Sequence, residues 1–110
     1  MAHKPQVEVF HQQDIESSHA ESSEPWHPFL QRPGLLAGLY QVAPGKSDQE
    51  THGVHEQDEV YYVIRGAGKI CANRNDYALS PGTVVFVKAG IVHYFYEVSE
   101  ELLLLVFFSG

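Results

Sequence analysis

The sequence has almost no cysteine and no long apolar run, and each of these absences excludes a class of protein. Its single cysteine, Cys71, cannot form an internal disulfide, which favours a reducing compartment. The longest apolar run, residues 102–108, is far shorter than the roughly 20 residues that a membrane helix needs. Residues 1–10 also lack the apolar core of a signal peptide. We therefore expect a cytoplasmic protein with no membrane partner.

Positive charge is scarce as well. The 110 residues include 7 Lys and Arg against 14 Asp and Glu, which gives a formal net charge of −7. This balance argues against a surface that binds the phosphate backbone of nucleic acids. The length suits a single folded domain. Histidine, by contrast, is abundant, since the seven histidines equal the lysines and arginines together.

The N-terminal part of the chain has too few aliphatic residues to form a core. Residues 12–28 are rich in Ser, Glu, Gln and His, and Pro25, Pro28 and Pro33 break helices. We expect residues 1–33 to form an extended arm with a short strand at residues 7–10. Trp26 and Phe29 would anchor this arm to a second region, residues 34–110.

Helical periodicity is missing after Pro33, and short apolar segments rich in β-branched and aromatic residues take its place. Turn-forming pairs such as Pro81-Gly82 and Ala89-Gly90 separate these segments. Gly66 and Gly68 are expected to end a strand that starts at residue 60. Seven or eight short strands at this spacing are typical of an all-β sandwich or barrel. The expected strands are residues 35–42, 60–64, 69–72, 77–79, 83–87, 92–98 and 102–108.

Two histidines and a group of carboxylates come directly before the strand expected at residues 60–64. If the chain is extended there, His55, Gln57, Glu59 and Tyr61 share one face of it. A carboxylate such as Glu59 that faces the interior is costly unless it is paired. A divalent metal bound by Glu59 and by imidazoles would provide that pairing.

A further histidine, His93, lies among large apolar residues on the same parity as Ile91 and Phe95. Taken alone, such a histidine is a core residue that is hydrogen-bonded to a backbone carbonyl. Together with His55 and Glu59 on strands that can adjoin, it is better explained as a metal ligand. The remaining histidines lie in the polar arm and are expected at the surface: His3, His11, His19 and His27.

Two stretches of the chain resemble the two sequence motifs of the cupin family. The first contains His55-x-x-x-Glu59 followed by a strand and Gly66, and the second contains Pro81-Gly82 and Ala89-Gly90-x-x-His93. The resemblance covers residues 40–108. It implies an all-β, double-stranded β-helix (jelly-roll) barrel that is often a homodimer. It also implies a metal ion inside the barrel, held by three histidines and one glutamate, which in this sequence are His52, His55, Glu59 and His93.

The chain departs from the family pattern at two positions. The first motif usually has the form His-x-His, but Gly53 stands two residues before His55, and the nearest histidine is His52. A bulge at Gly53 would bring His52 to the metal, because glycine accepts the backbone angles that a bulge needs; the alternative is an incomplete set of ligands. Lys88 stands where the second motif usually has proline, which leaves the position of His93 intact.

The predicted site suits one divalent transition metal, namely Fe, Mn, Ni, Co or Zn. Two functions remain open for it. One is a metal-dependent enzyme, an oxygenase, isomerase or lyase, that acts on a small polar organic molecule; the other is a non-catalytic cupin that binds a small ligand or acts as a sensor. Tyr61 and Phe95 are expected to face inward, where they either line the substrate pocket or fill the core. Val60, Tyr62 and Ile64 form an apolar stripe on the opposite face of the strand. A homodimer is expected because a partner subunit would cover this stripe.

Overall fold

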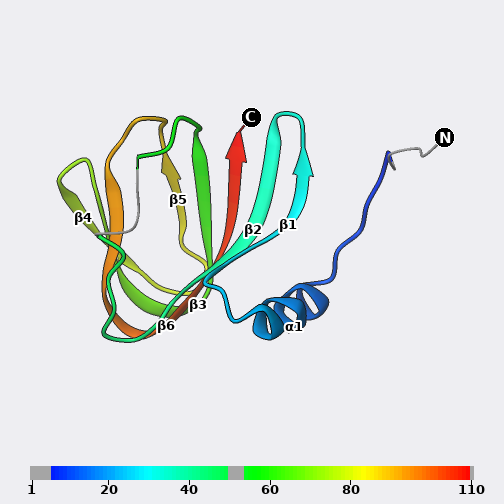
Figure 1. Ribbon diagram of the computed structural model, residues 1–110. Helices are drawn as coiled ribbons and strands as arrows, with labels where there is room; N and C mark the ends of the chain where they lie inside the picture. Colours follow the sequence, from blue (N-terminus) through cyan, green and yellow to red (C-terminus); the bar gives the residue numbers. More distant parts are fainter. Residues whose placement is uncertain (1–5, 50–53, 110) are drawn as a thin grey trace.

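The computed structural model describes residues 6–49 and 54–109, which form one helix and six strands. The elements in chain order are α1 (Gln12–Ser22), β1 (Trp26–Arg32), β2 (Leu35–Val42), β3 (Glu59–Ala72), β4 (Asn75–Leu79), β5 (Val84–Val87) and β6 (His93–Ser109). Every strand pairing is antiparallel, in the order β1-β2-β6-β3-β4, and β5 pairs with the first part of β3. The sheet curls on itself into the all-β jelly-roll barrel that the sequence predicts (Figure 1).

Two long strands dominate the barrel. β3 and β6 pair with each other from Glu59↔Phe108 at one end to Ala72↔His93 at the other. In Figure 1, β6 starts in the left part of the molecule and ends beside β2, and β3 runs with it. The two strands therefore connect the part of the sheet that contains β4 with the part that contains β1 and β2.

The prediction that Gly66 and Gly68 end a strand is wrong, because β3 continues through both. The pairing with β6 is shifted between Val63 and Arg65, and again on either side of Ala67, so the strand bends there without stopping. Gly66 has φ +99°, and a Cβ on it would lie 2.0 Å from the carbonyl oxygen of Glu101. Glycine is therefore needed for the bend. The two strands predicted at residues 92–98 and 102–108 are likewise parts of one continuous strand, β6.

The N-terminal arm also differs from the prediction, because residues 12–22 form the helix α1 and no strand forms at residues 7–10. The three helix-breaking prolines all follow the helix, so they do not oppose it. Within it, the side chain of Gln12 donates a hydrogen bond to Glu16 at 2.7 Å, and Asp14 lies in the first turn, where the helix dipole favours a negative charge. The boundary predicted between residues 33 and 34 falls in the turn between the paired strands β1 and β2.

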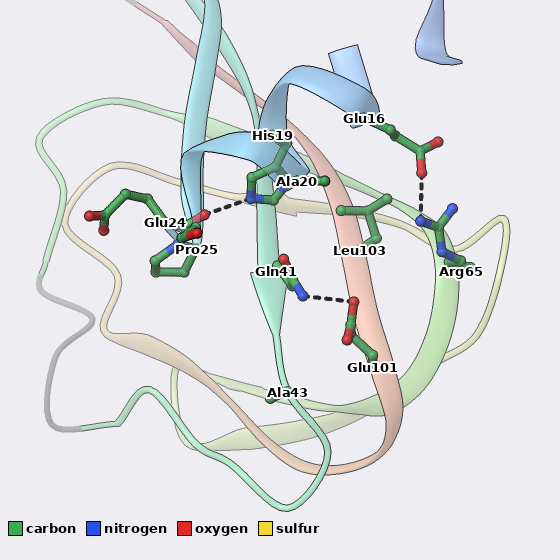
Figure 2. Close-up of a pocket in the computed structure, with 11 residues that line it drawn as sticks. Glu16, His19, Ala20, Glu24, Pro25, Gln41, Ala43, Arg65, Glu101 and Leu103 are labelled. Carbon is green, nitrogen blue, oxygen red and sulfur yellow. Dashed lines mark hydrogen bonds and ion pairs between the residues drawn. The ribbon is translucent and has the colours of Figure 1, made fainter. Parts of the chain in front are cut away.

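The arm is anchored to the barrel through several contacts. Trp26 lies opposite Tyr40 on β2 and packs edge-on against the ring of Phe108, as the predicted anchor role requires. The helix lies against the outside of the barrel, where Glu16 forms an ion pair with Arg65 (Figure 2). His19, which we expected at the surface, is only 4% exposed.

The environment of His19 explains its burial. Its Nε2 lies 2.7 Å from the carbonyl oxygen of Glu24 (Figure 2), and its ring stacks on His27 at 5.6 Å. A hydrogen bond and a stacked ring satisfy both the polar and the apolar parts of the imidazole. Between the helix and the barrel is a hollow of about 540 Å³, which Arg65, Gln41 and Glu101 help to line.

The core lies inside the curled sheet and confirms the predicted inward direction of Tyr61 and Phe95. Tyr61 is 1% exposed and Phe95 is fully buried. Their rings meet edge-on with centroids 5.1 Å apart. The other core residues are aliphatic: Val42, Val63, Ile70, Leu79, Val87, Val98, Leu102, Leu104 and Val106.

The outer face of β3 and β5 keeps an apolar surface. Tyr62, Val84 and Phe86 are 40%, 62% and 63% exposed, and the register places Tyr62 opposite Val84 and Val60 opposite Phe86. This is the stripe on which the sequence predicts a homodimer, and the homodimer stays a prediction. In the described part of the chain, no helix has the length and apolarity to cross a membrane.

Replacing Gly66 by alanine tests the bend in β3, with Gly82→Ala as a matched control. Both glycines have a positive φ, +99° and +91°, but a Cβ on Gly82 meets nothing within 4 Å. We expect Gly82→Ala to lower the free energy of unfolding by about 1 kcal/mol from backbone strain alone. Gly66→Ala should lower it by about 3 kcal/mol or more, because the clash with Glu101 adds to the strain. Urea unfolding measures both, and equal losses would contradict the close approach at Gly66.

Candidate metal centre

The candidate site forms because the two long strands bend. Glu59 begins β3 and His93 begins β6, but in the register of these strands His93 lies opposite Ala72, 13 residues after Glu59. In a flat sheet that separation would span about 40 Å, at about 3.3 Å per residue. In the barrel, His93 Nε2 is only 3.1 Å from Glu59 Oε2. The curl of the sheet therefore brings the two predicted ligands together.

Glu59 and His93 are both enclosed by the barrel. Glu59 is 1% exposed and His93 is 2% exposed. The Nδ1 atom of His93 lies 2.8 Å from the carbonyl oxygen of Ile91, and because a carbonyl only accepts, Nδ1 carries the proton. The hydrogen bond fixes the ring so that Nε2 points at Glu59, which is the usual second contact of a metal-binding histidine.

His55 reaches the cluster from the loop that precedes β3. Its Nε2 is 3.5 Å from Glu59 Oε1, and its side chain is 35% exposed. The predicted extended run before Glu59 is wrong, because residues 54–58 are not strand and Gln57 is exposed. The loop is held by the turn at Ala89 and Gly90, where Gly90 N donates to the carbonyl of His55 at 2.9 Å.

These three residues can hold a metal ion. One ligand atom from each of His55, Glu59 and His93 lies within 4.8 Å of the others. Glu59 Oε1 is buried and has no hydrogen-bond partner among residues 6–49 and 54–109. A buried carboxylate oxygen that faces imidazole nitrogens is suited to a divalent cation, so the residues present fit a metal. His52, the fourth predicted ligand, lies outside the described residues, and its role stays a prediction.

Burial and hydrogen bonding act in opposite directions on the two enclosed ligands. Burial works to raise the pKa of Glu59, but hydrogen bonds from His93 and Tyr61 outweigh it, so this pKa lies below its ordinary value. Burial works to lower the pKa of His93, but the Glu59 carboxylate and the Ile91 carbonyl outweigh it, so this pKa lies above its ordinary value. Without a metal, both shifts therefore favour the charged forms of the pair, a carboxylate and an imidazolium.

Tyr61 and Phe95, the predicted pocket residues, are placed differently from each other. The hydroxyl of Tyr61 donates to Glu59 Oε2 and lies 3.0 Å from His93 Nε2. Phe95 packs on the Tyr61 ring and fills the core. Whether either residue meets a substrate stays a prediction.

A second buried carboxylate, Asp48, was missed by the sequence-based reasoning. Asp48 is 5% exposed and accepts hydrogen bonds from the hydroxyl of Tyr40 and the backbone N–H of Phe95, both at 2.7 Å. Burial, together with this carboxylate, raises the pKa of Tyr40. Asp48 thus connects the loop after β2 to β6. No local pattern distinguishes it from the exposed acids around Asp58, because one partner, Tyr40, lies on the preceding strand and the other, Phe95, lies far away in the sequence.

Comparison with known proteins agrees with the fold of this chain. The family profile of the cupin domain matches residues 38–108. An uncharacterised protein of Streptomyces coelicolor is 33% identical over 103 residues, which cover 94% of this chain and 96% of that protein.

Solved structures with a similar fold support the same family assignment. TT1209 from Thermus thermophilus has a TM-score of 0.73 and 25% identity, with 94% of this chain and 97% of that chain covered. A crystal structure of the DMSP lyases RdDddP and RnDddQII has a TM-score of 0.60 and 26% identity. In that comparison, 69% of this chain and 38% of the other chain are covered.

The shifted pKa values predict how the stability of the metal-free protein depends on pH. A raised pKa of His93 contributes stability that is complete below its ordinary value of 6.5 and is lost as the pH rises through the higher value in the folded protein. We expect the free energy of unfolding to fall over that range, and to fall less in Glu59→Gln, where the charged partner is gone.

Urea unfolding from pH 5 to 9 in the presence of a chelator measures this difference. Glu100→Gln is the matched control, because Glu100 is an exposed carboxylate on β6. It should keep the pH dependence of the unmodified protein. The interpretation is wrong if Glu59→Gln keeps it too.

Proposed function

The chain belongs to the cupin family, and we propose that it is a metal-dependent enzyme of this family that acts on a small polar organic molecule. The observation that carries the proposal is the buried Oε1 of Glu59, which accepts no hydrogen bond from the described residues and lies in one cluster with the imidazole nitrogens of His55 and His93. We propose these three residues, together with His52, as the ligands of one divalent transition metal. The reaction class is that of an oxygenase, isomerase or lyase.

The ligand set favours a metal that accepts both nitrogen and oxygen. Neutral imidazoles with one carboxylate suit Fe, Mn, Ni, Co or Zn in the divalent state. Such an ion would supply Lewis acidity toward a substrate oxygen or, if it is iron, a site for oxygen chemistry. The protein's own part is to orient the ligands. Because the Nδ1 proton of His93 is held by Ile91, a neutral His93 offers the lone pair of Nε2.

A groove beside the cluster offers a path for a small molecule. It has a volume of about 710 Å³ and lies between β4 and β5. Three of its lining residues adjoin the ligands: Val87 lies opposite Glu59, Ala72 lies opposite His93, and Ile91 accepts the hydrogen bond from His93. The groove thus lies next to strand neighbours of the ligands, and this supports it as the path that a small molecule would take toward the site.

The lining of the groove supports a molecule of modest size and mixed polarity. Val85, Val87 and Ile91 provide apolar contacts, and Asp76 and Lys88 add one charge of each sign. The apolar residues exclude water from part of a bound molecule, and the charged residues orient its polar groups. Neither this groove nor the hollow under α1 is lined by His55, Glu59 or His93 themselves, but only the groove is lined by residues that adjoin them.

A non-catalytic cupin that binds a small ligand, or acts as a sensor, is the second candidate. The lining of the groove favours this non-catalytic candidate. Its polar side chains Asp76, Tyr77 and Lys88 are exposed, whereas a general acid or base is usually enclosed. The lyase structure supports the first candidate, since it is an enzyme with a similar fold. The two candidates share the metal site and differ only in turnover.

Metal content is the first test of the proposal. Protein purified without a metal-affinity step should contain about one equivalent of a transition metal, and His93→Ala should lose it, because removing a ligand leaves Glu59 poorly satisfied. His11→Ala is the control, since His11 is an exposed histidine of the arm. Elemental analysis measures the metal. Substoichiometric metal that does not change in His55→Ala would contradict the site.

Turnover then distinguishes the two candidates. The chelated protein is incubated with a panel of small polar organic molecules, with and without added metal. We expect substrate conversion or oxygen consumption to return when the metal is restored. Ligand binding without conversion would favour the non-catalytic candidate.

A further inference from the structure

The hydroxyl of Tyr61 lies between the two enclosed ligands. It donates a hydrogen bond to Glu59 Oε2, and its oxygen is 3.0 Å from His93 Nε2. Tyr61 is 1% exposed, and its ring packs edge-on against Phe95 and His93, with centroid distances of 5.1 and 5.9 Å. The position of the hydroxyl is therefore set by a packed ring on a central strand and not by a mobile side chain.

The two oxygens of the Glu59 carboxylate have different surroundings. Oε2 accepts the hydrogen bond from Tyr61 and lies 3.1 Å from His93 Nε2. Oε1 is buried, accepts no hydrogen bond from the described residues, and lies 3.5 Å from His55 Nε2. The carboxylate is thus held by one oxygen while the other is left without a hydrogen bond.

We propose that Tyr61 is a positioning residue of the metal centre. By holding Oε2, its hydroxyl fixes the rotation of the Glu59 carboxylate so that Oε1 is the oxygen presented to the metal. The inference rests on the proposed function, since it requires Glu59 to be a ligand. Without the hydroxyl, the carboxylate would lose the hydrogen bond that distinguishes its two oxygens, and part of the binding free energy of the metal would be used to orient it.

A purely structural role would give Tyr61 a different signature. Buried tyrosines usually find a hydrogen-bond partner for the hydroxyl, and losing that bond lowers stability without any effect on a metal. A positioning role lowers metal affinity beyond what the loss of stability explains. Substitutions of the groups that orient metal ligands typically reduce affinity by about 10- to 100-fold.

The test is a titration of the metal-free protein with Co(II), comparing Tyr61→Phe with Val63→Ala. Tyr61→Phe keeps the ring and removes only the hydroxyl. Val63→Ala is the matched control, because Val63 is fully buried two residues further along the same face of β3 and truncating it destabilises the core without changing the hydrogen bonds to Glu59. Urea unfolding confirms that both variants are folded and gives their loss of stability.

We expect Tyr61→Phe to raise the Kd for Co(II) by about ten-fold or more, and to change the visible spectrum of bound Co(II), which reports the coordination of the ion. Val63→Ala should keep both the Kd and the spectrum. An unchanged Kd in Tyr61→Phe, or an equal rise in both variants, overturns the positioning role while the metal site stands. If the unmodified protein does not bind Co(II), the metal site itself fails, and the positioning role fails with it.

Discussion

The rest of the site depends on one constraint, the burial of the Glu59 carboxylate inside an apolar barrel. A charged group in such a place is costly unless its surroundings compensate for it. Tyr61 and His93 compensate one oxygen, and His55 approaches the other without a hydrogen bond. The residue therefore has a structural cost that a purely apolar side chain would avoid, and the proposed metal ion would give Oε1 the partner that the described residues do not supply.

The curl of the sheet is what makes this constraint possible. The beginnings of β3 and β6 are far apart in the register of the two strands, and they meet only because both strands bend. The bend in β3 passes through Gly66, whose backbone lies against the carbonyl of Glu101 on β6. The glycine within β3 and the carboxylate at the start of the strand are thus parts of one arrangement. The proposed metal site thus depends on backbone geometry some distance from its candidate ligands.

Local patterns in the sequence predicted much of this arrangement. β2 was predicted with the bounds that the structure shows, and His55, Glu59 and His93 were predicted to meet. The errors have physical causes. A glycine with positive φ is equally suited to the end of a strand or to a bend within one, so the sequence alone wrongly predicts that the strand ends at Gly66. The helix at residues 12–22 is polar and short, and contacts with the barrel, such as Glu16 with Arg65, support it. Asp48 is recognised only through its hydrogen bonds to Tyr40 on β2 and to Phe95 on β6, which form in the folded barrel.

The most direct test of the central claim is anomalous diffraction at the cobalt edge from crystals of the protein grown with Co(II). We predict one strong peak inside the barrel, about 2.0–2.2 Å from Glu59 Oε1 and from the Nε2 atoms of His55 and His93. The same map would show whether His52 is the fourth ligand. A peak away from Glu59, or an empty barrel in crystals whose protein binds Co(II) elsewhere, would contradict the proposed metal centre.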